Sequence, residues 1–407
     1  ATLMDPSGPI LVTAFEPSGD AHAAPMIRAI RRQAPAARIV ALGGPRMAEA
    51  GAEMLEMTVE DAAMGLDALG KIRWLKGILG RLEARLPELR PVVHVPVDSP
   101  AANFPICRRT RAAGARIVHL VAPQLWAWGP WRIGKLRRLT DGVLCLLPFE
   151  PAWFAARGVP ARFIGHPRLQ RPVDEAAVRA RAADLGIPGA APGDGRRRLV
   201  LLPGSRRHEV ERNREDLVRL AAGLQRAAAA RGEDLAVTCS PTTEAVGRRM
   251  LEAAAAVGLD LGVWPGELDA VVLDADLALL VSGTVSLDVA RLGTPMVGVF
   301  RVRRASAMIA RVLLRTPDRL LPNLVAGERI VPEFVPWAGG LDPIQRAAEA
   351  LLSDRGCADR QRAGLAAVVA SSRGHDAEDE AAEAVLAVAR GEQFPAEGAG
   401  PQARPTG

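Results

Sequence analysis

The chain of 407 residues contains no tyrosine, and only three of its 52 basic side chains are lysines. Aromatic residues make up 4% of the sequence, so few aromatic side chains are available on which nucleic-acid bases could stack. We therefore expect no nucleic-acid partner. The net charge of +6 is carried almost wholly by arginine, and it suits phosphorylated substrates or acidic lipid.

Cysteine is scarce as well. The four cysteines lie far apart and form no Cys-x-x-Cys pair, and two of them, Cys145 and Cys239, fall inside apolar strand-like runs. This spacing is typical of buried free thiols in a reducing compartment rather than of a disulfide framework. The six histidines show no metal-ligand spacing either, so we expect no metal cofactor.

Two further absences narrow the class of protein. No apolar run approaches the ~20 residues of a membrane span, and the first residues lead into a strand-like run instead of a signal peptide. We therefore expect a cytoplasmic protein. The pattern Gly-x4-Gly-Lys-Ser/Thr is also absent, which argues against a P-loop ATPase.

The residues that are present alternate between short aliphatic runs and helical patterns. This alternation predicts βα units and therefore parallel sheets covered on both faces. The expected strands are 10–15, 38–42, 92–97, 116–121, 142–147 and 162–164, then 198–202, 235–239, 261–264, 277–281 and 295–302. The sequence thus predicts an α/β fold of two Rossmann-like, doubly wound parallel-sheet domains that face a cleft.

Residues 172–197 interrupt the alternation. They contain one expected helix, from Asp174 to Leu185, followed by a stretch rich in Gly, Pro and Arg, and we interpret them as the linker. The first domain then spans residues 1–171 and the second spans residues 198–355. C-terminal helices that return to the first domain are expected over residues 356–391, and a disordered tail over residues 392–407.

The most informative segment is LVLLPGSRRHEVER, residues 199–212, in which an apolar strand stops and a charged helix begins. Such a helix directs unpaired N–H groups and its positive dipole end toward the turn, so Gly204 and Ser205 can hold an anion gripped by Arg206. A similar turn follows the strand at 277–281 and contains Ser282, Gly283 and Thr284. An ordinary strand-to-helix turn explains either alone, but the two together favour a nucleoside diphosphate site.

Two carboxylates follow strands of the first half. Glu16 comes after 10–15 and Asp98 comes after 92–97, so both are expected at the sheet edge that faces the cleft. There Glu16 can accept sugar hydroxyls, and Asp98 can act as the general base for an attacking hydroxyl. The alternative is helix capping, by Ser18 and Asp20 in the first turn and by Asp98 in the second.

Residues 64–86 carry Ile and Leu at helical spacing with Lys and Arg around them. Core packing of this stripe is the favoured interpretation, and the alternative is a helix that lies on a membrane surface. The tryptophans Trp126, Trp128 and Trp131 are interpreted as core or interface residues, with Arg132 able to reach an anion.

Together these segments resemble the lipid-A-disaccharide synthase family, from about Ile10 to about Leu386. The matching residues of the first half are Glu16 with Ser18-Gly19-Asp20, Gly43-Gly44-Pro45-Arg46-Met47, Asp98-Ser99-Pro100 with Asn103, Trp126-Ala127-Trp128, Leu147-Pro148-Phe149-Glu150 and Gly165-His166-Pro167. Those of the second half are Leu202-Pro203-Gly204-Ser205-Arg206 with Glu209, Ser282-Gly283-Thr284, Leu321-Pro322-Asn323 and Pro332-Glu333.

The resemblance implies a GT-B fold and transfer of 2,3-diacylglucosamine from UDP to the 6-hydroxyl of 2,3-diacylglucosamine 1-phosphate. In this family's scheme Asp98 is the base of an inverting displacement and Glu16 shapes the sugar site. The residues expected to bind UDP are Gly204, Ser205, Arg206, Ser282, Gly283, Thr284, Asp288, Asn323 and Glu333. No cofactor is implied beyond the UDP-sugar donor.

The resemblance also implies a peripheral protein on the inner face of the inner membrane of a Gram-negative bacterium, and it is compatible with a homodimer. The chain departs from the family pattern at Phe15, Ala101, Ala102, Gln170, Asp288 and Pro336. On the residues alone two other classes stay open: another UDP-sugar enzyme of this fold, including an epimerase, and a catalytically silent lipid- or nucleotide-binding protein.

Overall fold

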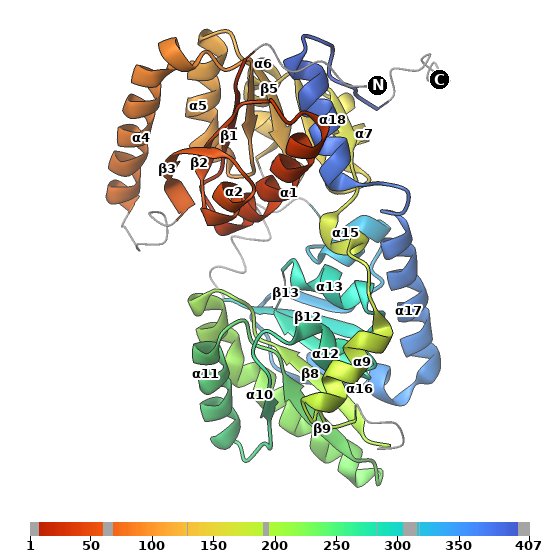
Figure 1. Ribbon diagram of the computed structural model, residues 1–407. Coiled ribbons are helices and arrows are strands. Elements are labelled where there is room, and N and C mark those ends of the chain that lie inside the picture. Colours follow the sequence, from red (N-terminus) through yellow and green to blue (C-terminus); the bar gives the residue numbers. More distant parts are fainter. Residues whose placement is uncertain are drawn as a thin grey trace. The chain divides into compact units, whose positions relative to one another are not determined.

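The computed structural model describes residues 8–59, 68–127, 129–189, 195–281, 283–303, 316 and 318–397. The chain divides into two compact units, one made of residues 1–167 with 374–407 and the other of residues 168–373 (Figure 1). Each unit has one parallel sheet with helices on both faces, which confirms the predicted α/β class and the two doubly wound sheets.

The sheet of the first unit has seven strands in the order β3-β2-β1-β4-β5-β6-β7. Their bounds are β1 Ile10–Thr13, β2 Ile39–Gly43, β3 Glu53–Met57, β4 Val93–Pro96, β5 Arg116–Leu120, β6 Gly142–Cys145 and β7 Ala161–Phe163. Strands β2 and β3 are added on one side of β1, and β4 to β7 on the other. The order of the strands therefore reverses between β1 and β4, and in open α/β sheets ligands bind at the carboxyl ends of the strands at such a reversal.

Alternation along the strands decides which helices cover which face. Ile10, Val12 and Ile39 pack on one face with α1 (Pro17–Gln33) and α18 (Ala377–Ala389). Leu11 and Val40 point to the opposite face, toward α4 (Ala68–Leu89). Further helices of this unit are α2 Pro45–Glu49, α5 Pro100–Ala112, η1 Pro130–Arg132, α6 Ile133–Leu139 and α7 Glu150–Ala155.

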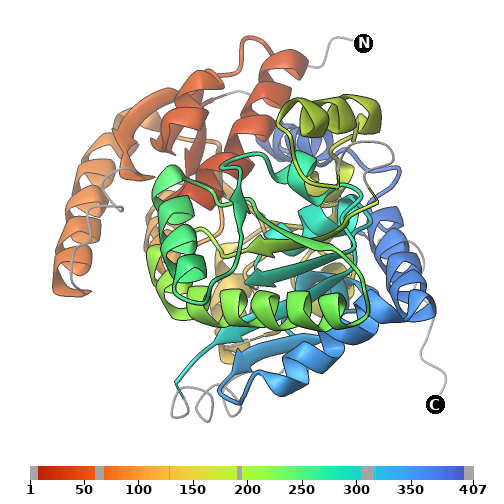
Figure 2. The ribbon, with the colours of Figure 1, turned by 90° about the horizontal axis from the view of Figure 1, so that it is seen from below.

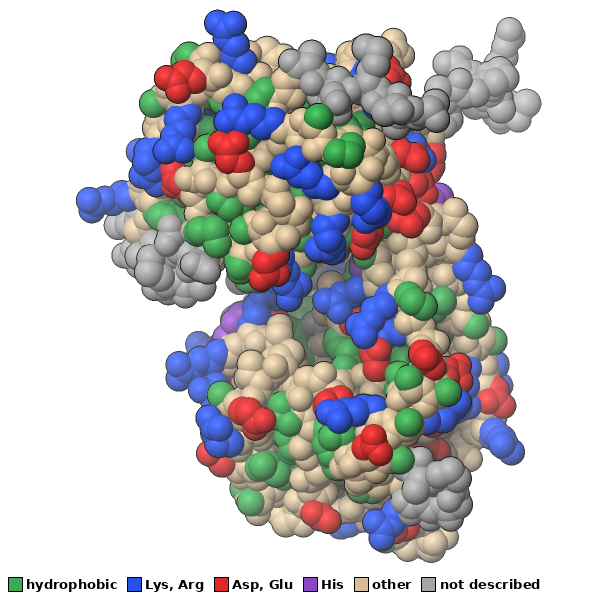
Figure 3. Space-filling model, in the orientation of Figure 1, with side chains coloured by type: hydrophobic (Ala, Val, Ile, Leu, Met, Phe, Trp, Pro, Cys, Tyr) green, Lys and Arg blue, Asp and Glu red, His purple; other side chains and the backbone are tan. Residues whose placement is uncertain are grey.

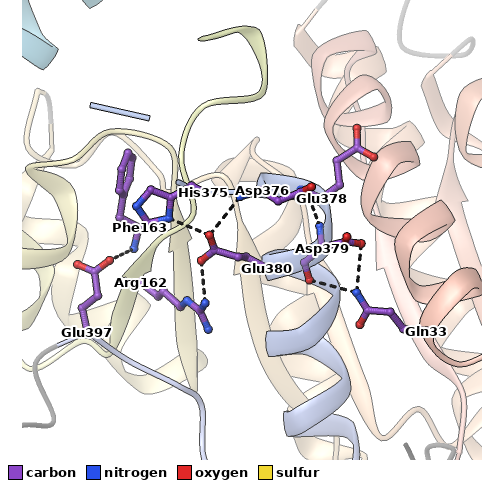
Figure 4. Close-up of polar contacts among 9 residues, drawn as sticks. All are labelled: Gln33, Arg162, Phe163, His375, Asp376, Glu378, Asp379, Glu380 and Glu397. Atoms are coloured by element: carbon purple, nitrogen blue, oxygen red, sulfur yellow. Dashed lines mark hydrogen bonds and ion pairs between the residues drawn. The ribbon is translucent and has the colours of Figure 1, made fainter. Parts of the chain in front are cut away.

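Helix α18 returns from the end of the chain to the first unit, and polar contacts fix its N-terminal end (Figure 4). Glu380 accepts from Arg162 at 2.7 Å and contacts His375 Nδ1 at 2.8 Å, while Gln33 of α1 donates to Asp379 at 3.2 Å. Helix α17 (Arg355–Ala370), in contrast, belongs to the second unit. Only part of the region 356–391 therefore packs where the sequence placed it.

The beginning of the expected disordered tail is ordered. Phe394 is buried over Gly142, where a Cβ would overlap its ring, and Glu397 accepts from the backbone N–H of Phe163 at 2.8 Å. The prediction of disorder is wrong for residues 392–397 because one aromatic side chain anchors them in the core. The remaining residues, 398–407, lie outside the described residues.

The sheet of the second unit has six strands in the order β10-β9-β8-β11-β12-β13. Their bounds are β8 Arg197–Leu202, β9 Leu235–Cys239, β10 Gly262–Val263, β11 Leu277–Val281, β12 Met296–Arg301 and β13 Glu333–Trp337. Here the order reverses between β8 and β11. Strands β3 and β13, each at a sheet edge, were not predicted from the sequence.

Helices cover both faces of this sheet (Figure 2). Helices α10 (Arg207–Ala230), α11 (Glu244–Ala255) and α16 (Asp342–Ser353) pack on one face. Helices α9 (Glu175–Asp184), α12 (Leu268–Val272), α13 (Val285–Arg291) and α17 pack on the other. The short helices α8 (Pro167–Gln170) and α15 (Leu321–Ala326) complete the unit.

The segment predicted as a linker, residues 172–197, is part of the second unit. Its helix α9 is capped by Asp174, which accepts from the N–H of Ala177 at 3.0 Å, as the sequence predicts for a helix starting there. Ala182 and Ile187 are buried in the core, and Leu185 O accepts from the Trp264 indole at 3.1 Å. The interpretation as a free linker is wrong because these apolar side chains have a partner surface, including that of α12.

Candidate active site

The first unit brings Glu16 and Asp98 together where the strand order reverses. β1 and β4 are neighbours, with Thr13 paired to Pro96, and the two carboxylates follow the carboxyl ends of these strands. Ser99 Oγ donates to Glu16 Oε1 at 3.1 Å, so the turn after β4 directly contacts the turn after β1. Glu16 is exposed and Asp98 is half-buried, which leaves both accessible to a substrate hydroxyl.

The backbone at Asp98 is strained. Asp98 has φ of 49° and Ser99 has φ of 39°, so two successive residues with side chains adopt the left-handed conformation. Each residue in this conformation costs of order 1–3 kcal/mol of folding free energy, so it persists only where the surrounding contacts hold it in place. Asp98 N donates to Leu120 O at 3.1 Å, and Asn103 Nδ2 donates to Asp98 O at 2.8 Å. Ser99, not Asp98, is the N-cap residue of α5, and its side chain makes no capping hydrogen bond.

Asp20 has a different partner from the one the sequence suggested. Its buried carboxylate accepts from the backbone N–H groups of Gly44, Arg46 and Met47 at 3.0–3.2 Å, and so caps α2 instead of its own helix. A Cβ at Gly44 would lie 2.5 Å from Asp20 Oδ2, which explains why glycine stands there. Asp20 therefore joins α1 to α2.

The second unit likewise brings its two predicted anion turns together. Strands β8 and β11 are neighbours, with Leu202 paired to Leu280, and the turns follow their carboxyl ends at the reversal of strand order. Gly204 has φ of 91°, and a Cβ there would lie 3.5 Å from Val281 Cγ1. Gly204 is half-buried, whereas Ser205, Gly283 and Thr284 are exposed. Ser282 lies outside the described residues.

Arg206 is the N-cap residue of the 24-residue helix α10, and its side chain is 66% exposed. Its guanidinium contacts Glu209 Oε1 at 3.0 Å, and its N–H donates to Glu209 Oε2 at 3.3 Å. The buried Glu209 thus holds Arg206 over the first turn, next to Gly204. This arrangement keeps a positive side chain beside the N-terminus of a long helix, where an anion is stabilised by the dipole as well.

Asp288 lies away from the surface. It is 2% exposed and pairs with Arg168 of α8, and burial raises its pKa while Arg168 opposes that shift. Arg291, on the same helix, pairs with Asp269 at 2.7 Å. The side chain expected to bind UDP therefore fastens α13 to the start of the second unit in this structure.

Asn323 and Glu333 hold each other. Asn323 is buried, exchanges hydrogen bonds with the backbone of Val331 and donates to Glu333 Oε2 at 3.0 Å. Glu333 also accepts from the N–H groups of Arg319 and Leu320 at 2.9 and 2.8 Å, at the start of α15. The two residues expected to bind UDP therefore hold the segment 319–333 in its conformation through these hydrogen bonds.

The structure adds one carboxyl that sequence reasoning missed. Glu150 is buried, and it accepts from the Trp126 indole at 3.0 Å and from the N–H of Leu147 at 3.1 Å. Burial raises the pKa of Glu150 to about 7, against the lowering effect of these hydrogen bonds. Both partners of the Trp126–Glu150 hydrogen bond lie in stretches that match the family pattern, Trp126-Ala127-Trp128 and Leu147-Pro148-Phe149-Glu150. This match is the sequence feature that could have indicated Glu150. Trp128 lies outside the described residues.

Helix α4 confirms most of the core interpretation. Leu79, Leu82 and Leu86 are buried against the sheet, and Phe15 meets Trp74 edge-to-face at 5.9 Å. Ile72, however, is 53% exposed, and Lys and Arg side chains gather on the outer face of this helix (Figure 3). The part of the predicted helix before Ala68 falls in residues 60–67, outside the described residues.

Two general expectations concern metals and thiols. Cys145 and Cys239 are buried free thiols, as predicted. No group of three or more His, Cys, Asp or Glu side chains suited to a metal ion occurs in the described part of the chain. Over the same residues, no helix has the length and apolar character needed to cross a membrane.

Proteins of similar sequence show the family of the chain. The family model described as "Lipid-A-disaccharide synthetase" matches residues 10–387. Lipid-A-disaccharide synthase of Anaeromyxobacter sp. (strain K) is 36% identical over 386 residues, which cover 94% of this chain and 97% of the relative.

Solved structures show the fold. S. aureus MnaA, in a co-structure with UDP, aligns with a TM-score of 0.55 at 13% identity over 93% of this chain and 95% of its own. Acinetobacter baumannii MurG aligns with a TM-score of 0.53 at 12% identity over 93% and 99%. The two doubly wound sheets are those of the GT-B fold. The chain belongs to the lipid-A-disaccharide synthetase family and is a glycosyltransferase of lipid A biosynthesis.

Proposed function

We propose that the chain transfers 2,3-diacylglucosamine from its UDP derivative to the 6-hydroxyl of 2,3-diacylglucosamine 1-phosphate, giving a β-1,6 disaccharide 1-phosphate and UDP. The observation that carries the proposal is the chemistry at the two reversals of strand order. One presents the contacting turns of Glu16 and Asp98, and the other presents two adjacent strand-to-helix turns that we assign to the diphosphate. A carboxylate and a diphosphate site are what an inverting sugar transfer requires.

The carboxylates act on the acceptor. Asp98 takes the proton of the acceptor's 6-hydroxyl as the oxygen attacks the anomeric carbon of the donor. The bond from that carbon to the diphosphate oxygen breaks on the opposite side, and its electron pair leaves with UDP, so the configuration inverts. Glu16, exposed beside the Asp98 turn, accepts a sugar hydroxyl and orients the ring.

The second unit stabilises the leaving diphosphate. Backbone N–H groups at Gly204 and Ser205, the N-terminus of α10 and the guanidinium of Arg206 oppose the developing negative charge. Gly283 and Thr284 extend the same surface from the neighbouring strand. Asp288, Asn323 and Glu333 hold the elements around these turns in place.

Gly204→Ala tests the diphosphate turn. A Cβ there would lie 3.0 Å from Glu209 Oε2, in a backbone conformation with φ of 91°, so it pushes Glu209 and with it Arg206. We expect the Kd for UDP in calorimetry to rise about tenfold, the scale of one weakened charge-assisted contact.

Gly232→Ala is the matched control, because Gly232 also has a positive φ, of 76°, and nothing lies within 4 Å of its Cβ position. It imposes a similar backbone strain away from the turn and leaves UDP affinity unchanged. Equal losses in both variants would contradict the assignment of the turn.

The acceptor's phosphate is assigned to a positive cluster on the first unit, formed by Arg108 of α5, Arg132 of η1 and Lys135 of α6. The Lys135 ammonium lies 4.7 Å from the centroid of the Phe104 ring, and its pKa is lowered by burial and by the charges of Arg108 and Arg132. A group of positive side chains attracts a phosphate. Arg132 and Lys135 follow β5, whose last residue, Leu120, accepts from Asp98 N, and Arg108 lies on the helix that precedes this strand.

Lys135→Ala is therefore expected to raise the KM for the acceptor about fivefold and to leave UDP affinity unchanged, as one partly exposed cation is lost. Initial rates at varied acceptor concentration measure this effect. Arg28→Ala, at an exposed site on α1, is the control for a general loss of charge. If Lys135→Ala leaves the KM for the acceptor unchanged, the assignment of the phosphate to this cluster is contradicted.

Both lipid substrates keep their acyl chains in the membrane, so the enzyme works at its surface. Ile72 and the basic outer face of α4 supply an exposed apolar side chain beside cations, which suits the anionic inner face of the inner membrane (Figure 3). Sedimentation with anionic and neutral vesicles tests this placement, and binding that is independent of vesicle charge would contradict it.

The reaction itself is tested by incubating the purified protein with the UDP-linked and 1-phosphate diacylglucosamines in detergent. Mass spectrometry is expected to show the tetraacyl disaccharide 1-phosphate, with UDP released in equal amount. UDP binding without product would instead indicate a catalytically silent binding protein, and release of UDP to a water-soluble acceptor would indicate another sugar transferase.

A further inference from the structure

Beneath the Asp98 turn lie four polar side chains with no exposed surface: Thr13 of β1, His94 of β4, and Asn103 and Thr110 of α5. They form one continuous set of hydrogen bonds. Thr110 Oγ1 lies 2.9 Å from His94 Nδ1, His94 Nε2 lies 2.8 Å from Thr13 Oγ1, and Thr13 Oγ1 lies 2.7 Å from Asn103 Oδ1. Four buried polar groups in an apolar layer are costly unless each is satisfied.

The direction of every bond in this set can be deduced. The Asn103 amide group Nδ2 faces two carbonyls, Val97 O at 3.1 Å and Asp98 O at 2.8 Å, and only the NH2 group can donate to both. Asn103 Oδ1 must then accept the hydroxyl proton of Thr13. Because the Thr13 hydroxyl donates its one hydrogen bond to Asn103, its oxygen can only accept from the ring of His94, and the donor is His94 Nε2–H.

This reasoning fixes the tautomer of His94. Burial, together with the charge of the neighbouring His119, lowers the pKa of His94 to about 3, so the ring is neutral near pH 7 and carries one proton. That proton is on Nε2, and Nδ1 accepts from the Thr110 hydroxyl at 2.9 Å, a shorter contact than those of the same hydroxyl with Ile106 O at 3.2 Å and Cys107 O at 3.3 Å. The chain therefore runs one way, from Thr110 through His94 and Thr13 to Asn103, and ends on the carbonyls of Val97 and Asp98, which belong to the two peptide groups on either side of the Asp98 Cα.

We propose that the buried chain Thr110–His94–Thr13–Asn103 is a positioning device that holds Asp98 and Ser99 in their left-handed conformation and thereby aims the Asp98 carboxylate. Its catalytic consequence rests on the proposed function, whereas its effect on the turn does not. The chain links β1, β4 and α5, the three elements that surround the reversal of strand order, so each fixes the position of the others.

The physical reason is the strain at the turn. Two successive non-glycine residues with positive φ relax to ordinary conformations unless something opposes the change. The two hydrogen bonds from Asn103 Nδ2 hold the carbonyls of Val97 and Asp98, and Thr13 keeps the Asn103 amide from rotating. Loss of the Thr13 hydroxyl leaves Asn103 Oδ1 and His94 Nε2–H unpaired in the core, so the amide turns and the Asp98 turn loosens.

The first test needs no substrate. In the full-length protein labelled with 15N-histidine and 13C-aspartate, the His94 nitrogens are expected to show the Nε2–H tautomer. Thr13→Val is expected to change both the His94 signals and the carboxyl 13C signal of Asp98, while Thr13→Ser restores both. Thr140→Val is the matched control, because it removes another buried hydroxyl of the same unit, bonded to Ile117 O and Gly142 O.

The kinetic test separates positioning from binding. Thr13→Val is expected to lower kcat by about 10-fold to 100-fold with little change in either KM, because a misaimed base affects the transition state alone. Thr13→Ser recovers most of the rate, and Thr140→Val stays near the parent protein. An Nδ1–H tautomer of His94, or an Asp98 signal that Thr13→Val leaves unmoved, would overturn the proposal. A parent protein with the expected signals and no disaccharide product would contradict the proposed function alone.

Discussion

Asp98→Asn is expected to lower kcat for disaccharide formation by about 10³-fold or more and to leave the Kd for UDP unchanged. The amide has nearly the shape of the carboxylate but cannot take the proton of the attacking hydroxyl, and a positioned general base contributes about 10²-fold to 10⁴-fold. We assign UDP binding to the turns after β8 and β11, which belong to the other unit. Product formation measured by mass spectrometry and calorimetry with UDP separate the two effects.

Asp359→Asn is the matched control, since Asp359 is an exposed aspartate of α17 that pairs with Arg362 on the same helix. An exposed pair of this kind contributes little, so rate and stability are expected to stay near those of the parent protein. Asp98→Asn with retained turnover would remove Asp98 from the role of base. A parallel loss of UDP binding would show instead that the substitution disturbs the whole protein.

Glu150→Gln is expected to abolish a pH dependence of stability worth roughly 3 kcal/mol. The pKa of Glu150 is about 7 in the folded chain, against an ordinary value of 4.5. Between these two pH values the unfolded chain releases the proton while the folded chain retains it, so the free energy of unfolding falls as pH rises. Above about pH 7 both states are ionised, and this contribution no longer changes.

Urea unfolding of the full-length protein at pH 5 and pH 8 measures the effect. The loss of stability between the two pH values is expected to be smaller in Glu150→Gln than in the parent protein, because glutamine does not titrate. At pH 5 the variant is expected to be the less stable of the two, since its amide offers one acceptor oxygen for two donors, the Trp126 indole and Leu147 N. Glu83→Gln, at an exposed site, provides the control. Identical pH dependences in parent and Glu150→Gln would contradict the raised pKa.

The central strands were predictable because burial on both faces makes them continuous aliphatic runs. The edge strands were not. Residues 53–57, Glu-Met-Leu-Glu-Met, are helix formers by propensity, and residues 333–337 contain Pro336. Pairing with β2 and β12 decides their conformation, and no local pattern records that pairing.

The site residues likewise fall into two groups, those whose position the sequence predicted and those whose partners only the structure shows. Glu16, Asp98, Gly204 and Gly283 are placed by the position of their strand ends, so the sequence located them at the edges where the structure has them. The sequence did not indicate which polar side chains turn inward. Asp20 caps a different helix and Asp288 pairs with Arg168, because backbone N–H groups and guanidiniums from distant segments lie within their reach.

By itself the sequence determined the βα alternation, the central strands of both sheets and the chemistry at their carboxyl ends, since each depends on residues adjacent in the chain. Tertiary structure alone decided the order of the strands, the anchoring of Phe394 over Gly142 and the raised pKa of Glu150. It also decided the hydrogen-bonded chain below Asp98, which joins residues up to 90 positions apart. These features depend on desolvation and on contacts between distant segments, and such contacts exist only after the sheet has formed.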